Sequence, residues 1–183
     1  MKSIVVLGMH RSATSLVSQG LSRAMPPVHM GNQGFFGKGI GEDGNSANDQ
    51  GFWEDIRYVQ LNNALLEAAG GSWHDPPSKK AILSLSPLWD DNIKKLVQDS
   101  ENEAESYGCK FWGWKDPRTV LTFPLYKPFL KNLHVVSIFR GMDDVVNSLL
   151  ESSGDDPKKS KEEWEVVYKK YNSRLLSIVK DYT

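Results

Sequence analysis

The feature that most constrains the fold lies near the N-terminus, where a short apolar run leads into a loop rich in hydroxyl groups. Residues 4–7 form an uninterrupted Ile-Val-Val-Leu run, which is typical of a strand buried on both faces of a parallel sheet. A loop from Gly8 to Ser15 follows, and residues 12–23 are expected to form a helix. This order places backbone N–H groups at a helix N-terminus, where anions bind.

A similar order of elements recurs in the C-terminal half of the chain. Residues 110–114 and 133–139 predict two further strands, and the second leads through Arg140 into a helix over residues 142–150. Alternating strands and helices predict an α/β fold, a three-layer sandwich with a mostly parallel sheet. Ligands bind beyond the carboxyl ends of such strands, so Arg140 and the first loop are both expected at the ligand site.

The remaining segments complete a single domain over residues 1–183, a length that suits one hydrophobic core. A Gly-rich stretch over about 26–51 has no periodicity and is expected to be a flexible or functional loop. His134 falls in a predicted buried strand, where a structural role is expected. Further helices are predicted over residues 54–69, 89–105, 120–130 and 161–181.

Composition excludes several classes of partner. The formal net charge is −1, so no general basic field exists to hold nucleic acid, and any anion site must be built locally. Cys109 is the only cysteine, which excludes a disulfide within the chain and favours a reducing, cytoplasmic location. The apolar run at residues 4–7 is too short for a signal peptide, and no stretch approaches the ~20 apolar residues of a membrane helix. No metal-ligand spacing is present.

The loop differs from the phosphate loop of nucleoside triphosphatases, G-x-x-x-x-G-K-[ST]. Aligned from Gly8, the chain has Ala13 for the second glycine and Thr14 for the lysine, and its cation is Arg11 instead. This pattern argues against ATP or GTP hydrolysis. Because alanine is costly at positive φ, the loop either keeps φ negative at Ala13 or is strained there. A plain strand-to-helix turn with a capping serine is the alternative reading.

The segment Gly-Met-His-Arg-Ser-Ala-Thr-Ser that begins at Gly8 resembles the 5′-phosphosulfate loop of PAPS-dependent sulfotransferases, a P-loop-like family whose donor is 3′-phosphoadenosine 5′-phosphosulfate. Ala13 departs from the glycine usual in that family, and the chain is short for a member. The resemblance covers roughly residues 1–150. Three further segments agree in the family's order: Gly51-Phe52-Trp53-Glu54, Lys115-Asp116-Pro117, and the element from Arg140 to Ser148.

The resemblance implies a P-loop NTPase-like fold and transfer of a sulfuryl group from PAPS to a hydroxyl or amine acceptor, without a metal. It assigns charge stabilisation to Arg11 and Lys115, and general base catalysis to Glu54. Arg118 is assigned to the sulfonate or the acceptor. The residues that it assigns to the donor nucleotide are His10, Arg11, Ser12, Ala13, Thr14, Ser15, Arg140 and Ser148.

Alternatives remain open at several of these residues. Glu54 also suits a helix start, Lys115 and Arg118 also suit structural ion pairs, and His10 and His29 are alternative bases. The tryptophans at positions 53, 73, 112 and 114 suit either ligand stacking or the core. The acceptor is a small molecule, carbohydrate, lipid or peptide. The rival functions are a nucleotide or small-molecule kinase with a degenerate loop, and a non-catalytic nucleotide-binding module.

Overall fold

A computed structural model describes residues 1–31, 53–152 and 157–181, so most of the expected Gly-rich loop lies outside the described residues. Within them a sheet of four parallel strands runs in the order β2-β3-β1-β4. The strands are β1 (Lys2–Leu7), β2 (Val28–His29), β3 (Phe111–Lys115) and β4 (Leu133–Ser137). The predicted α/β class with a parallel sheet is confirmed, and β2 is a strand that the sequence did not predict.

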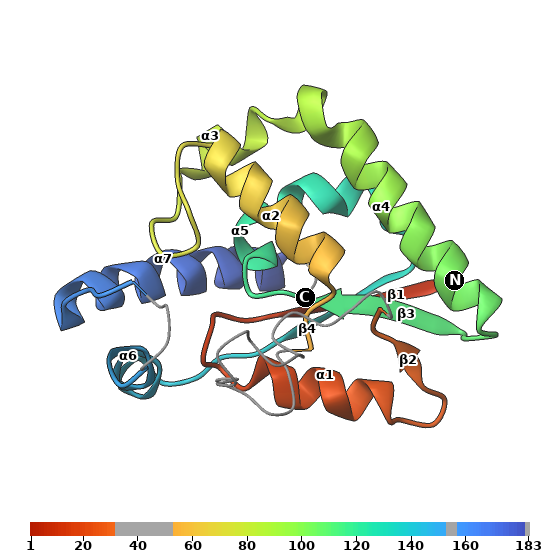
Figure 1. The fold of residues 1–183 in the computed structure, drawn as a ribbon, viewed down its shortest axis with the longest axis horizontal. Coiled ribbons are helices and arrows are strands. Elements are labelled where there is room, and N and C mark those ends of the chain that lie inside the picture. Colours follow the sequence, from red (N-terminus) through yellow and green to blue (C-terminus); the bar gives the residue numbers. More distant parts are fainter. Residues whose placement is uncertain (32–52, 153–156, 182–183) are drawn as a thin grey trace, which may run out of the picture.

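Helices cover both faces of this sheet (Figure 1). The helix α1 (Thr14–Ser22) lies alone on one face, while most of the other helices lie on the opposite face, which gives three layers. A short 3-10 helix, η1 (Lys127–Phe129), follows α5. The remaining helices are α2 (Ile56–Ala68), α3 (Lys79–Leu83), α4 (Ser86–Ser106), α5 (Thr119–Tyr126), α6 (Met142–Leu150) and α7 (Lys161–Lys180).

Strand register brings the predicted ligand-binding segments to one edge. Val6 of β1 lies opposite Lys115 of β3, and Leu7 lies opposite Ser137 of β4. All three strands are parallel, so the segments that follow them leave at the same end of the sheet. The chain moves from β1 to one side and later crosses to β4 on the other, and ligands of open parallel sheets bind beyond the strand ends at such a reversal.

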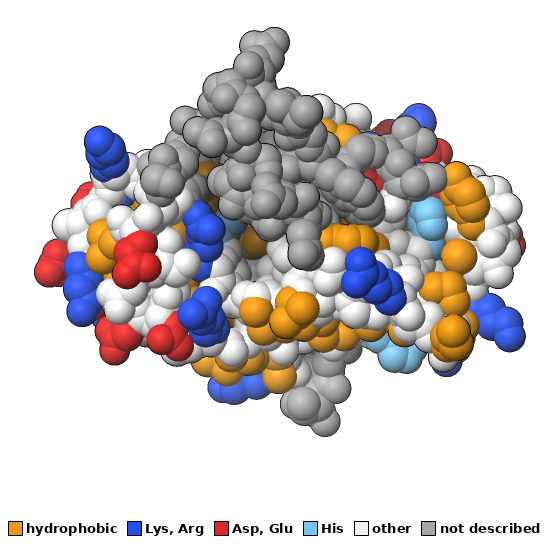
Figure 2. Space-filling model, turned by 60° about the horizontal axis from the view of Figure 1, so that its bottom comes forward, with side chains coloured by type: hydrophobic (Ala, Val, Ile, Leu, Met, Phe, Trp, Pro, Cys, Tyr) orange, Lys and Arg blue, Asp and Glu red, His pale blue; other side chains and the backbone are white. Residues whose placement is uncertain are grey.

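The two faces of the sheet bury unequal cores. The larger core lies under α2, α4, α5 and α7, where Tyr58 stacks on Trp114 with ring centroids 4.3 Å apart. Trp112 is also buried there, so these two tryptophans belong to the core. The smaller core, beneath α1, centres on Val6, Val28 and Met30. Figure 2 shows hydrophobic side chains gathered on this second face, where a single helix leaves part of the apolar surface uncovered.

The sequence of the first helix predicts an apolar stripe against the sheet, and this prediction is wrong at two of its positions, Leu16 and Gly20. Leu16 is 70% exposed, and the space around Gly20 is open, whereas Thr14 and Ser18 are buried. The reason is close packing at the helix start, because a Cβ at Gly8 would lie 2.7 Å from Thr14 Cγ2. Only small polar side chains fit against the sheet there, so Leu16 turns outward, while Val17 and Leu21 pack against the smaller core.

The prediction that residues 133–139 form a fully buried strand is also wrong. The strand β4 is the last in the described sheet, and most of its side chains are half-buried. His134 is exposed, and its Nδ1 lies 3.0 Å from the carbonyl oxygen of Asn132. A strand with a neighbour on one side only leaves its other edge open, so His134 is a surface residue and not part of the core.

The helices that the sequence predicted agree with the structure to within a few residues at their ends, and α3 is a short helix that the sequence did not predict. Asp55 caps α2 by accepting a hydrogen bond from the backbone N–H of Arg57 at 3.0 Å, so this helix begins two residues later than expected. Ser160 and Glu163 form a capping box at the start of α7. No helix within the described part of the chain is long and apolar enough to cross a membrane.

Candidate functional site

The loop between β1 and α1 has the backbone of an anion cradle. Arg11 and Ala13 both lie in the left-handed region, with φ of 64° and 61°. Left-handed residues alternating with right-handed ones turn successive N–H groups toward a common concavity. Ala13 is also the N-cap of α1, and its side chain supplies no acceptor to the first-turn amides. A bound anion would supply acceptors at this position.

The sequence left two conformations open for Ala13, a negative φ or a strained positive one. Its φ is positive, so the loop is strained at this residue. A left-handed conformation costs an alanine roughly 1–2 kcal/mol, a cost that glycine does not carry. Strained backbone of this kind is concentrated at functional sites. Ser12 and Thr14 are buried on either side of Ala13, which holds the loop in place.

Arg140 lies at this loop, as the strand order predicted. Its Nη1 donates a hydrogen bond to the carbonyl oxygen of Arg11 at 2.8 Å, and its side chain stays 43% exposed. The hydroxyl of Tyr168 on α7 donates to the backbone carbonyl of Arg140 at 2.7 Å, which fixes the turn before α6. The guanidinium of Arg11 donates to Ser152 Oγ at 2.7 Å.

Ser148 is not brought to the same point. It lies half-buried in α6, and among the described residues no hydrogen bond joins it to Arg140 or to the loop. Its predicted contact with a second phosphate therefore stays a prediction that no observed contact supports.

Four charged side chains meet beyond the carboxyl end of β3, and we call them the charge cluster: Glu54, Lys115, Asp116 and Arg118. Lys115 Nζ lies 2.7 Å from Glu54 Oε1, and Arg118 Nη1 lies 2.8 Å from Asp116 Oδ1 and 3.4 Å from Glu54 Oε2. All four are at most 7% exposed. Lys115 Nζ also donates to Ser15 Oγ at 3.2 Å, which joins the cluster to the loop.

A buried hydrogen-bond network holds the charge cluster from behind. Asn62 of α2 donates to Asp116 Oδ2 at 2.8 Å and to Thr119 Oγ1 at 3.1 Å. Thr122 and Tyr126 of α5 donate to the Asn62 carbonyl oxygen at 2.6 and 3.0 Å. The sequence did not predict Asn62 as a site residue, although an amide on the same helix face as Tyr58 and Leu65 is a detectable signal.

Burial dominates the electrostatics of the cluster. It raises the pKa of Glu54 and lowers the pKa of Lys115, while the attraction between the two groups opposes both shifts. Removing one member of such a group leaves a buried charge without its partner, which is strongly destabilising. The charges of the cluster are therefore mutually dependent.

His10 lies in the loop beside the charge cluster and is packed among aromatic rings. Its ring stacks on Trp73 with centroids 4.3 Å apart and meets Tyr171 edge-on at 6.0 Å. Both ring nitrogens are buried without a hydrogen-bond partner in the described residues. Burial lowers the pKa of His10 well below its usual value, and the charges of Arg118, Lys115 and Arg11 lower it further, so the ring is neutral at pH 7.

The helix α7 holds the aromatic wall behind His10. The hydroxyl of Tyr171 donates to the carbonyl oxygen of Trp73 at 3.0 Å, and the Trp73 ring stacks on Trp164 with centroids 5.7 Å apart. Trp73 is therefore the tryptophan that the structure places beside His10. Trp53 precedes Glu54 with a positive φ of 54°, and Gly51 and Phe52 of the same predicted motif lie outside the described residues.

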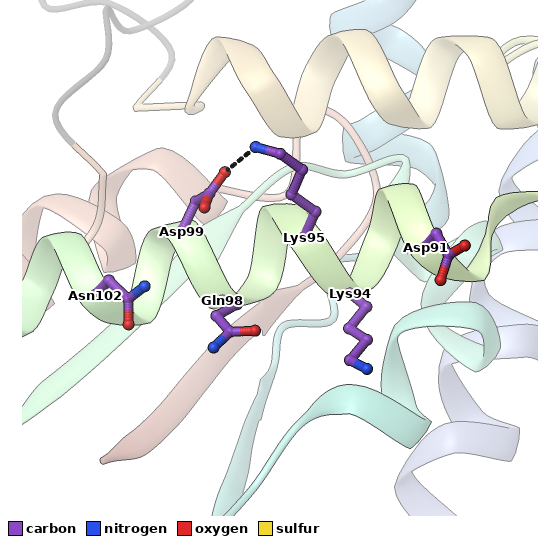
Figure 3. Close-up of a pocket in the computed structure, with 6 residues that line it drawn as sticks. All are labelled: Asp91, Lys94, Lys95, Gln98, Asp99 and Asn102. Carbon is purple, nitrogen blue, oxygen red and sulfur yellow. Dashed lines mark hydrogen bonds and ion pairs between the residues drawn. The ribbon is translucent and has the colours of Figure 1, made fainter.

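The clearest surface depressions lie away from this site. One runs along a single face of α4, where Figure 3 shows Lys95 and Asp99 joined by an ion pair of 2.9 Å. Another lies beside β2, near His29, whose ring stacks on Tyr107 and approaches Glu103 at 3.8 Å. His29, an alternative base from the sequence, thus faces that depression. The described residues contain no group of three or more ligands suited to a metal.

Comparison with known proteins adds no family. No protein-family model, curated protein or solved structure matches the chain. The resemblance to sulfotransferases therefore rests on the motifs themselves.

The strain at Ala13 predicts that Ala13→Gly raises the free energy of unfolding by about 1 kcal/mol, because glycine adopts positive φ without steric cost. Urea denaturation at pH 7.5 measures the change. The matched control is Ala64→Gly within α2, which should lower stability by about 1 kcal/mol. A destabilising Ala13→Gly would contradict the strained loop.

The buried neutral His10 predicts a stability that depends on pH. Its pKa in the folded state lies below the unfolded value near 6.5, so the unfolded chain binds the proton more tightly. The stabilising contribution is complete above pH 6.5 and falls by up to ~1.4 kcal/mol per pH unit below it. Urea denaturation between pH 8 and 5.5 should show this slope, reduced in His10→Gln. The control is His134→Gln, which alters an exposed histidine; an unchanged slope in His10→Gln would refute the assignment.

Proposed function

We propose that this chain is a sulfotransferase that binds PAPS at the loop from Gly8 to Ser15 and transfers its sulfuryl group to a hydroxyl or amine acceptor. The observation that carries the proposal is the junction of two cationic elements at one helix start. The loop contributes an amide concavity with Arg11, and Lys115 reaches the same helix start through Ser15 at 3.2 Å. Two cations and the loop amides suit an anhydride that carries negative charge on both sides of its bridging oxygen.

The donor's 5′ end would lie over the start of α1. In that position the loop amides supply hydrogen bonds to non-bridging oxygens, and the dipole of α1 favours their negative charge. The acceptor oxygen attacks sulfur, and the bond from sulfur to the bridging oxygen breaks, so charge develops on the departing 5′-phosphate. Arg11 and Lys115 would stabilise that charge, and the loss of either is expected to cost on the order of 10²–10³ in rate.

Arg140 supports recognition of the second phosphate. One of its N–H groups is used by the Arg11 carbonyl oxygen, while the side chain remains 43% exposed. Its Nε also lies 3.8 Å from Asp144 Oδ2, an exposed ion pair with which a 3′-phosphate would compete. The remaining N–H groups of the guanidinium are left for that phosphate. This second anion site is what separates PAPS from a nucleotide with one phosphorylated end. Ser148 stays a predicted partner.

The role of Glu54 is twofold in this proposal. Its carboxylate neutralises Lys115 at 2.7 Å and contacts Arg118 at 3.4 Å, so it orients both cations. Its action as the general base, which the sequence motif implies, stays a prediction. Arg118 is paired with Asp116 and Glu54, which makes it a positioning residue for the cluster as well as a candidate acceptor contact.

One observation favours a second candidate, a nucleotide-binding module without turnover. Lys115 is committed to Glu54 in the absence of a ligand, and catalysis requires it to turn part of its charge toward the donor. Both candidates predict nucleotide binding, and release of adenosine 3′,5′-bisphosphate from PAPS across a panel of phenol, sugar and amine acceptors separates them.

The kinase reading loses support because Thr14, at the position of the kinase lysine, is buried. The cytoplasmic location and the absence of a nucleic-acid partner stay predictions.

Calorimetry with adenosine 3′,5′-bisphosphate tests the donor site. We expect wild-type binding that Arg140→Ala weakens about 10- to 100-fold, because a charge-assisted contact to a phosphate is lost. Adenosine 5′-monophosphate, which lacks the 3′-phosphate, should bind the wild type more weakly and lose little in the same variant. The matched control is Arg23→Ala, which removes an exposed arginine beyond the end of α1. Failure of the wild type to bind the bisphosphate would refute the proposal.

A further inference from the structure

Several buried polar atoms around His10 have no hydrogen-bond partner among the described residues. Buried donors and acceptors in native proteins almost always have partners, so each exception calls for a physical reason. Here both ring nitrogens of His10 and the Nε of Arg118 are buried without a partner among the described residues. Val6 of β1 pairs with Lys115 of β3, so His10 and Arg118 both follow within four residues of that pair, at the same end of the sheet.

The unpaired atoms define what would satisfy them. A neutral imidazole presents one N–H donor and one lone pair, and Arg118 Nε adds a second donor. A hydroxyl or amine both donates and accepts, and it could therefore bond to the imidazole lone pair and to a neighbouring N–H. These are the acceptor classes of the proposed sulfuryl transfer, on which this inference rests.

We propose that His10 takes the proton from the acceptor nucleophile, and that it can do so only while the anionic donor is bound. The acceptor's O–H or N–H bond breaks and leaves its electron pair on the nucleophilic atom, which forms a bond to sulfur. The bond between sulfur and the bridging oxygen breaks with its electron pair on the 5′-phosphate. The proton moves to the unprotonated ring nitrogen of His10, so atoms and charge balance without another reactant.

Geometry favours His10 over Glu54 as this base. Each carboxylate oxygen of Glu54 already faces a buried cation, Lys115 or Arg118. Protonating Glu54 would leave both of those cations without their shared counter-charge. The lone pair of His10 has no partner among the described residues, so proton transfer to it breaks no interaction there. Glu54 then acts as a positioning residue that keeps the two cations in place.

The negative charge of the bound donor allows the His10 ring to take up a proton. The charged and titratable groups around His10 are Arg11 from its own loop, Lys115 from β3, Arg118 at the start of α5, and the Tyr171 phenol from α7. Three of the four are cations, and they oppose a proton on His10 while the site is empty. A donor with several negative charges over the same loop offsets those cations and increases the proton affinity of the ring. The base therefore becomes competent when the donor arrives.

Proton uptake on nucleotide binding tests this inference directly. Adenosine 3′,5′-bisphosphate is titrated into the protein at pH 6.5 in two buffers of different ionisation enthalpy, which yields the number of protons taken up per nucleotide. Phosphate groups change their own protonation on binding, so the measured quantity is wild-type uptake minus uptake by His10→Gln. We expect the wild type to take up more protons per nucleotide than His10→Gln. The matched control His134→Gln, which alters an exposed histidine, should behave as the wild type.

The outcomes are separable. Equal uptake by the wild type and His10→Gln overturns the inference, while no binding by the wild type refutes the proposed function instead. Turnover of PAPS provides a second readout: His10→Gln should lose about 10²- to 10⁴-fold in kcat with little change in nucleotide affinity, and equal kcat values overturn the inference. If His10→Gln does not fold, ¹⁵N NMR of the wild-type histidines replaces it. The His10 signal, identified by its contact with Trp73, should titrate at a higher pH with the nucleotide bound than without it, and equal titration would overturn the inference.

Discussion

The ion pair between Lys115 and Glu54 is the interaction on which the rest of the site depends. It joins the end of β3 to the residues that precede α2, and through Ser15 it reaches the start of α1. Burying two charges is costly unless they are paired and hydrogen-bonded. The pair is therefore better explained by the positions it enforces than by a gain in stability. It brings a cation to the loop while keeping the cluster electrically balanced.

The loop and the charge cluster would both help to hold an anion over the start of α1. An anion over the start of α1 needs amides that point toward it, and the left-handed residues Arg11 and Ala13 provide that orientation at a cost in strain. It also needs cations that do not fill the space themselves. Arg140 and Lys115 are held beside this position by other groups. Arg140 donates to the carbonyl oxygen of Arg11, and Lys115 pairs with Glu54. The empty site is thereby preorganised.

Much of this arrangement could be predicted from the sequence because it follows from local pattern and sheet topology. The apolar run before Gly8 predicted β1, and parallel strands place their carboxyl ends together, which brought Arg140 to the loop. Other features depend on contacts between segments that lie far apart in the sequence, and the sequence alone does not show those contacts. A two-residue strand such as β2 has no periodicity to detect, and the exposure of His134 depends on β4 having one neighbour. The pairing of Glu54 with Lys115, 61 residues away, depends on how α2 packs over β3.

The central claim is that a nucleotide with phosphate at both its 5′ and 3′ positions binds at the loop from Gly8 to Ser15. A crystal structure with adenosine 3′,5′-bisphosphate tests it most directly. We predict the 5′-phosphate on the amides at the start of α1, with the 3′-phosphate on the side chain of Arg140. A nucleotide bound in the depression beside β2 or along α4, with the loop amides left without it, would contradict the account.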